Sequence, residues 1–209
     1  MIKNDKNIKI VFVRHKTRIG NLIARYSYFR DILNFGILKS IYYTLFKKYE
    51  FEKLNNGKEL IFSHSYLVID KYRFDIHYFY GVIIQKENLN EYKNLRFYDD
   101  FVFFENKNFY GVIFNFNVNE EEYQKCLDIV LDLFSNQYES DQIIKYDWGD
   151  LLYFLFPKIR GHSKNYICST FVYDFLAKIG KITKIDKEII SPNLLFNLII
   201  KSLKWKRKK

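Results

Sequence analysis

The feature that most constrains this chain is an apolar repeat of helical period near its C-terminal end. Between residues 166 and 180 the apolar side chains recur every three or four positions, at Cys168, Phe171, Val172, Phe175, Leu176 and Ile179. This spacing predicts a helix with one buried face, and Gly180 is placed to end it. Cys168 then lies in the first turn, where free backbone N–H groups and the helix dipole stabilise a thiolate. Taken alone, a cysteine in such a place is more often a small core residue than a nucleophile.

A cysteine nucleophile needs a base within hydrogen-bonding reach and a group that orients that base. The chain offers four histidines. His64 lies in a strand predicted for residues 60–69, and His77 lies in a strand predicted for residues 74–78. The short connector at residues 70–73 predicts a hairpin, so the two histidines can share a face across neighbouring strands. One would accept the proton of Cys168, and the other would fix the tautomer of the first ring.

The remaining histidines are less constrained by the pattern. His15 ends the first predicted strand between two basic residues, where a solvated or phosphate-facing role fits it. His162 lies in a polar, basic loop ahead of Cys168 and is expected to be exposed, close enough to the nucleophile to touch substrate. Two histidines and a cysteine could also bind zinc, but no CxxC or HExxH spacing supports this alternative. We therefore predict no metal and no cofactor.

Composition indicates a folded protein with a large positive charge. Of the 209 residues 48% are hydrophobic and 20% aromatic, which excludes a disordered chain. The net charge of +10 would suit nucleic acid, an anionic membrane or an acidic polymer such as a cell wall. Because the sequence has no zinc finger, no RNP-type motif and no basic helix with heptads, we predict no specific nucleic-acid partner.

The predicted location is the cytoplasm. Residues 1–9 are polar and charged, unlike a signal peptide, and no uncharged apolar run reaches the roughly 18–20 residues that span a bilayer. Two cysteines are too few for a disulfide framework, and a reducing compartment suits two unpaired thiols. Cys126 shares a helical face with Tyr123, Val130 and Phe134, which indicates a core residue. The basic cluster at residues 204–209 is expected to be a solubilising tail.

The order of the predicted elements indicates an α+β fold. Strands are expected at residues 8–13, 60–69, 74–78, 81–85 and 110–116. Helices are expected at residues 17–26, 120–134, 146–156 and 166–180 and from Ser191 onward. Asn119 and Ser191 are the expected N-caps, with Pro192 in the first helical position. A small, mostly antiparallel sheet would then pack against several helices.

Six short segments, taken together and in this order, resemble a known family. They are Phe62–Ile69, Asp75–Tyr78, Gly81–Val82, Tyr146–Trp148, Ile167–Val172 and Ser191–Asn193. The family is the circularly permuted branch of the NlpC/P60 papain-like superfamily, which includes YiiX/YaeF-type proteins and short bacteriophage proteins. In that branch the histidine strand precedes the cysteine helix, as it does here.

The resemblance implies Cys168 as nucleophile, His64 as general base and His77 as the third, orienting residue. It covers roughly residues 8–27 and 60–200 of what we expect to be a single permuted NlpC/P60-like domain, residues 1–209. Residues 29–59 are then expected to be a helical insertion. Two positions depart from the family pattern: Thr170 replaces a frequent acidic residue, and Tyr78 replaces a small one.

The chemistry that the resemblance implies is acyl transfer through a thioester. Three functions are open, and we favour the first: an amidase or endopeptidase acting on peptide bonds, those of peptidoglycan included. The second is a lipid acyltransferase or thioesterase with the same three residues. The third is a non-catalytic structural component of a virion that binds other virion proteins. A phage-encoded member would act in the host cytoplasm or in the virion.

Overall fold

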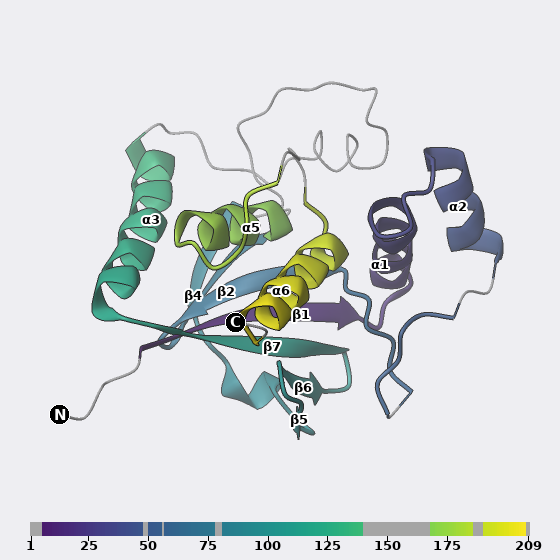
Figure 1. The fold of residues 1–209 in the computed structure, drawn as a ribbon, viewed down its shortest axis with the longest axis horizontal. Coiled ribbons are helices and arrows are strands. Elements are labelled where there is room, and N and C mark those ends of the chain that lie inside the picture. Colours follow the sequence, from purple (N-terminus) through teal and green to yellow (C-terminus); the bar gives the residue numbers. More distant parts are fainter. Residues whose placement is uncertain are drawn as a thin grey trace.

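The architecture is a seven-stranded antiparallel sheet with helices packed over one of its faces (Figure 1). The structure, a computed structural model, describes residues 6–47, 50–55, 57–77, 81–139, 168–185 and 190–207. The strands are β1 (Lys6–His15), β2 (His64–Ile69), β3 (Tyr72–His77), β4 (Gly81–Lys86), β5 (Arg96–Phe97), β6 (Val102–Glu105) and β7 (Phe109–Val118). Their order across the sheet is β4-β3-β2-β1-β7-β6-β5, and each neighbouring pair is antiparallel.

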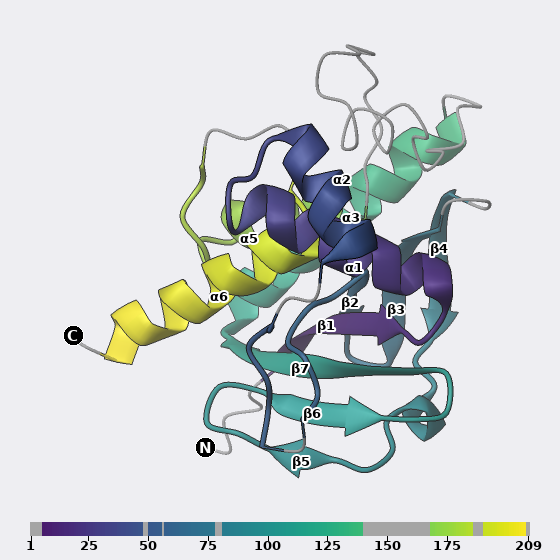
Figure 2. The same cartoon turned by 90° about the vertical axis from the view of Figure 1, so that its right-hand side faces the viewer.

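The described helices form a second layer above the sheet. They are α1 (Arg18–Asp31), α2 (Ile37–Phe46), α3 (Glu120–Glu139), α5 (Cys168–Lys178) and α6 (Pro192–Arg207). The 3-10 turn η1 (Leu89–Glu91) lies outside this layer, and Tyr92 beside it packs on the opposite face of the sheet. Helices α3, α5 and α6 lie over the sheet, whereas α1 and α2 lie against each other near the end of β1 (Figures 1 and 2). None of these described helices combines the length and the apolar character that crossing a bilayer requires.

The central strand β1 divides the core into two parts, because its side chains alternate between the faces of the sheet. The residues that join the main core beneath the helices are Ile8, Ile10 and Phe12. Those that join a smaller cluster on the opposite face are Val11 and Val13. The antiparallel register pairs Val13 with His64. This register brings the first residue of β2 to the same end of the sheet as the start of α1.

The α+β class and the mostly antiparallel sheet are confirmed. The sequence pattern does not predict β5 and β6, since these strands are short and lie between polar turns. It also predicts β2 from residue 60, whereas the strand begins at His64. A two-residue turn, Asp70 and Lys71, joins β2 to β3, with Asp70 at a φ of 53°. The helix predicted at residues 146–156 lies outside the described residues.

The predicted starts of two helices are confirmed by their hydrogen bonds. At α3, the backbone N–H of Glu122 donates to Asn119 Oδ1 at 2.8 Å, and that of Asn119 donates to Glu122 Oε2 at 3.1 Å. This reciprocal pair is a capping box. At α6, Ser191 Oγ accepts from the N–H of Leu194 at 3.1 Å, and Pro192 is the first helical residue.

Residues 29–59 contain the end of α1, all of α2 and the chain that returns to the sheet. A separate cluster of buried side chains packs here, formed by Ala24, Phe29, Phe51 and Ile61. At the other end of the chain, α6 continues to Arg207. The first four residues of the predicted basic tail, 204–207, are therefore the last residues of this helix.

Candidate active site

Helix α5 is described from Cys168 onward, and the apolar repeat predicts this residue in the first turn. The side chain of Cys168 is buried, with 4% of its surface exposed, and lies close enough to His64 to raise the pKa of that imidazole. After the helix, Gly180 adopts a positive φ of 71°, the usual conformation of a residue that ends a helix. The fold therefore brings together the cysteine and the histidine that the sequence singles out.

His64 stands between this thiol and a carboxylate. Its Nε2 hydrogen-bonds Oδ2 of Asp75 at 3.1 Å and lies 2.9 Å from Oδ1 of the same residue. Because Nε2 faces the carboxylate, Nδ1 is the ring nitrogen left to face Cys168. The imidazole is thus placed as the middle member of a Cys–His–Asp series.

Asp75 is a buried residue of β3, and its carboxylate contacts a second cationic side chain besides His64, that of Arg73. Arg73 donates to Oδ2 of Asp75 from Nη2 at 2.5 Å and from Nε at 3.2 Å. The two residues lie two positions apart on one strand, so their side chains share a face of the sheet. A buried carboxylate with two cationic partners keeps its charge, and two N–H groups of one guanidinium on the same oxygen fix its orientation.

Arg73 is itself fixed by an aromatic residue of β2. Its Cζ lies 3.7 Å from the centroid of the Tyr66 ring, a cation–π contact. The hydroxyl of Tyr66 in turn lies 3.1 Å from that of Tyr92. Arg73 Nη1 also lies 3.6 Å from a carboxylate oxygen of Glu91. The orientation of Asp75 is therefore supported by Arg73, which is itself held by Tyr66 and Glu91.

Charge pairing outweighs burial at this site. Burial disfavours the imidazolium of His64, but the Asp75 carboxylate and the interaction with the Cys168 side chain raise the pKa of His64 to about 10. Burial also disfavours the carboxylate of Asp75, yet His64 and Arg73 hold the pKa of Asp75 well below its usual range. At neutral pH His64 therefore carries a proton and Asp75 is ionised.

His15 lies at the edge of this group. Its ring centroid is 6.3 Å from that of His64 and 5.9 Å from that of Phe109. Burial lowers the pKa of His15, and the positive charges of His64 and Arg73 lower it further. His15 is therefore neutral at neutral pH and stands beside a charged imidazole.

A buried amide fixes the chain just ahead of His64. Asn193 of α6 accepts a hydrogen bond from the N–H of Phe62 at 2.8 Å. Its amide nitrogen donates to the carbonyl of Ala24 at 2.9 Å and to Ser27 Oγ at 2.5 Å. The side chain of Asn193 thus connects α6 to α1 and to the residues just before β2. These contacts give Asn193 a structural role in the Ser191–Asn193 segment.

The start of α5 is tied down by its own hydroxyl residues. Ser169 Oγ donates to the carbonyl of Ile190 at 2.5 Å, and Thr170 Oγ1 accepts from the N–H of Ile190 at 3.2 Å. Thr170, which departs from the family pattern, therefore holds the segment that leads into α6. These contacts set the position of the first turn that carries Cys168.

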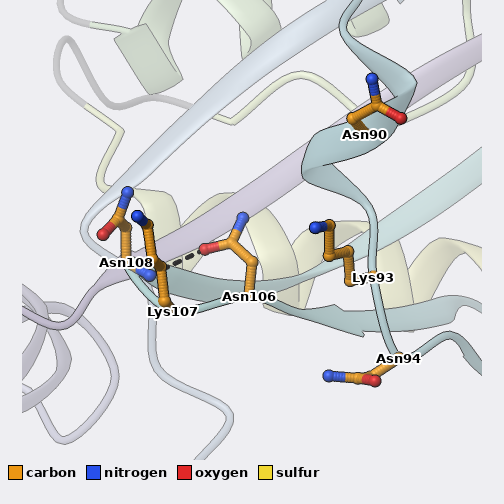
Figure 3. Close-up of a pocket in the computed structure, with 6 residues that line it drawn as sticks. All are labelled: Asn90, Lys93, Asn94, Asn106, Lys107 and Asn108. Carbon is orange, nitrogen blue, oxygen red and sulfur yellow. Dashed lines mark hydrogen bonds between the residues drawn. The ribbon is translucent and has the colours of Figure 1, made fainter.

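A polar depression lies elsewhere on the surface and has a different character (Figure 3). Its lining residues are Asn90, Lys93, Asn94, Asn106, Lys107 and Asn108. The side chain of Asn106 serves the local turn, since its Oδ1 accepts from the N–H groups of Asn108 and Phe109 at 2.9 Å and 3.0 Å. None of the candidate catalytic residues lines it.

The residues that the sequence reasoning missed are Asp75 and Arg73. Asp75 lies two positions before His77 on the same strand, and it hydrogen-bonds the His64 ring. His77 ends β3, and its side chain lies outside the described part of the structure, so a role for it stays a prediction. His162 also lies outside the described residues. A charged residue inside a strand between apolar Phe74 and Ile76 is the signal that could have revealed Asp75.

Within the described ranges, no three His, Cys, Asp or Glu side chains gather into a set that could hold a metal ion. Comparisons of the chain with family models, with curated proteins and with solved structures find no match.

Proposed function

We propose that this chain is a cysteine hydrolase that cleaves amide or ester bonds through an acyl-enzyme. The observation that carries the proposal is the placement of His64 between the carboxylate of Asp75 and the thiol of Cys168. A nucleophile, a base within reach and a group that orients the base are the three parts this chemistry needs. The roles are Cys168 as nucleophile, His64 as acid and base, and Asp75 as the positioning residue.

The first half of the reaction forms a thioester. The raised pKa of His64 favours transfer of the thiol proton to its ring, which leaves a thiolate beside an imidazolium. The sulfur of Cys168 attacks the substrate carbonyl carbon, and a carbon–sulfur bond forms. When the bond to the leaving amine or alkoxide breaks, His64 returns its proton to that group.

The second half releases the acyl group. A water molecule gives a proton to the now neutral His64 and attacks the thioester carbonyl carbon. The carbon–sulfur bond breaks, the carboxylic acid leaves, and the sulfur regains the imidazolium partner. In both halves the carbonyl oxygen carries negative charge, and the N–H groups of the first turn of α5 are suited to stabilise it, because they have no partner within the helix.

The resemblance supports a papain-like fold in circularly permuted order, because β2 with His64 precedes α5 with Cys168. The substrate that follows from this resemblance is a peptide bond, with peptidoglycan stem peptides as the first class to test. Lipid esters are the second class, since the same three residues would serve a thioesterase or an acyltransferase.

Intact-mass spectrometry of the trapped acyl-enzyme tests the proposal. The full chain is mixed with an activated ester, with peptidoglycan fragments and with lipid esters, and is quenched in acid at short times. We expect one acyl group per chain, mapped to Cys168, and none in Cys168→Ala. Cys126→Ala, which changes the other cysteine, is the matched control and should still be acylated. Absence of acylation with every substrate, or unchanged acylation in His64→Ala, would contradict the proposal.

A further inference from the structure

Helix α2 is packed with its polar side inward. The buried residues of this helix are Ser40 and Thr44. Their hydroxyls are satisfied locally: Ser40 Oγ donates to the carbonyl of Phe35 at 3.2 Å, and Thr44 Oγ1 donates to the carbonyl of Ser40 at 2.6 Å. These small residues let α2 lie close against α1, with Tyr43 beside them packed against Phe29 of α1.

Four large apolar side chains of α2 point outward. Leu38 is 84% exposed and Phe46 is 74% exposed, and Leu45 and Tyr42 are 54% and 47% exposed. Their positions follow the i, i+4, i+7, i+8 spacing, so they form one stripe along the helix. Scattered exposed apolar residues are ordinary, but a contiguous stripe on a helix indicates a surface that meets another apolar phase. We call these four residues the outer stripe.

Positive charge surrounds the outer stripe. Lys39 and Lys47 belong to this helix and its C-cap, and both are exposed. Lys39 Nζ lies 4.2 Å from the ring centroid of Phe35, and Lys47 Nζ lies 5.9 Å from that of Tyr42. Residues 32–49 contain three lysines and no acidic residue. Over residues 6–49, Asp31 is the single acidic residue against ten lysines and arginines.

We propose that α2 is a docking surface for an anionic lipid bilayer. The outer stripe would enter the boundary between headgroups and acyl chains, and the lysines beside it would lie at the level of the lipid phosphates. At ten residues α2 is about 15 Å long, which suits a helix lying in the plane of the interface and not one that spans it. Each basic residue near such a surface adds attraction that salt screens.

A second copy of this chain fits the same face less well. Two outer stripes packed together would bring Lys39 and Lys47 of one copy near those of the other. No acidic residue of α2 could offset that repulsion, because residues 37–46 contain none. Each copy would also carry a net charge of +10. An anionic surface matches both the apolar and the charged parts of this face.

Vesicle co-sedimentation of the full chain tests the proposal. Two vesicle types are compared, phosphatidylcholine alone and phosphatidylcholine mixed with phosphatidylglycerol, each at low and at high salt. We expect binding to the anionic vesicles that is at least about tenfold tighter than to the neutral ones and that falls as salt rises. Leu38→Ser combined with Phe46→Ser should abolish it, and Lys39→Glu combined with Lys47→Glu should weaken it about tenfold.

Matched controls distinguish binding through the outer stripe from non-specific binding to vesicles. Phe97→Ser removes an equally exposed aromatic residue from β5, and Lys107→Glu reverses a charge at the polar depression of Figure 3. Both should bind as the unchanged chain does. Cys168→Ala should also bind normally, so a failed hydrolase would not affect this result. Apart from Cys168, all the changed side chains are exposed, and Cys168→Ala removes a single sulfur atom, so circular dichroism should show the same fold in every variant.

Three outcomes would overturn the proposal. The first is no binding to either vesicle type, and the second is equal binding to neutral and anionic vesicles. The third is self-association in sedimentation velocity that the Leu38 and Phe46 changes abolish while vesicle binding is unaffected. That last result would assign the outer stripe to a second copy of the chain.

Discussion

Nε2 of His64 lies 2.9 Å from Oδ1 of Asp75, and both side chains are largely buried. Neither group would keep its charge easily at this depth without the other. Arg73 adds two further hydrogen bonds to the same carboxylate, so three charged groups balance one another behind the thiol of Cys168. The proposed chemistry of Cys168 depends on these charges, and the substitution Asp75→Asn removes one of them.

Asp75→Asn is expected to lower the pKa of His64. The amide keeps the shape of the side chain but removes the carboxylate that, after burial, has the largest effect on this pKa. NMR titration of the imidazole measures the change directly. The matched control is Asp128→Asn on the exposed face of α3, which should leave His64 unchanged. An unchanged titration in Asp75→Asn would show that the carboxylate does not set the charge of His64.

The same substitution should destabilise the fold in a pH-dependent way. The depressed pKa of Asp75 stabilises the folded state above its unfolded value of 3.8, and this gain is lost as pH falls through the folded value. The raised pKa of His64 stabilises the folded state below its unfolded value of 6.5, and this gain is lost as pH rises toward about 10. The pair therefore stabilises most between these two unfolded values.

Urea unfolding of the unchanged chain and of Asp75→Asn across this pH range checks the sign. We expect a difference of about 3 kcal/mol inside the window, since the substitution leaves the buried Arg73 without its carboxylate. The difference should shrink at both ends of the range. A difference that is constant with pH would mean that the substitution acts through packing alone.

Asn193→Ala should lower the free energy of unfolding by about 2–4 kcal/mol, because it leaves the buried N–H of Phe62 without its partner and removes the hydrogen bonds from α6 to Ala24 and Ser27. It should also loosen the entry to His64. Asn197→Ala is the matched control one turn later, where one half-buried hydrogen bond to the carbonyl of Asn193 is lost. Its cost should stay below about 1 kcal/mol. If the two variants lowered the free energy of unfolding equally, Asn193 would have no greater structural role than Asn197.

Gly111→Ala should prevent folding. A Cβ at this position of β7 would lie 1.9 Å from the carbonyl oxygen of Phe12 and 2.8 Å from the ring of Phe104, so the central strands would have to separate. Gly36→Ala adds the same methyl group where no atom lies within 4 Å, and it should cost at most about 1 kcal/mol. Circular dichroism and thermal melting compare the two. A folded, stable Gly111→Ala would contradict the strand pairing of β1 with β7.

The parts of the fold that the sequence predicts are those with local signals. Asn119 and Ser191 are recognisable as N-caps because each accepts a hydrogen bond from a backbone N–H within one turn of its own helix. The strand β6 has no such signal, because four residues are too few for alternation to show. The packing of α2 also could not be predicted from the sequence. An apolar stripe on a helix ordinarily predicts the buried face, but the buried residues of α2 are Ser40 and Thr44.

The candidate site divides in the same way. Cys168 is found from the helical repeat, and His64 from the scarcity of histidines and the hairpin pattern. The partner of His64 is not found, because Asp75 and His77 lie two positions apart and share a face of β3. Period-two alternation cannot say which of the two reaches the ring. The hydrogen bond of Asp75 with the His64 ring is seen only in the folded chain.

The measurement that tests the central claim most directly is the alkylation of Cys168 by iodoacetamide as a function of pH. Mass spectrometry follows both cysteines, with Cys126 as the internal control, because burial raises the pKa of Cys126 to about 12. A thiolate paired with the imidazolium of His64 should react at about pH 6, at least roughly tenfold faster than in His64→Ala. If Cys168 is as silent as Cys126 at that pH, or reacts equally fast in His64→Ala, the thiolate–imidazolium pair does not exist and the hydrolase proposal fails.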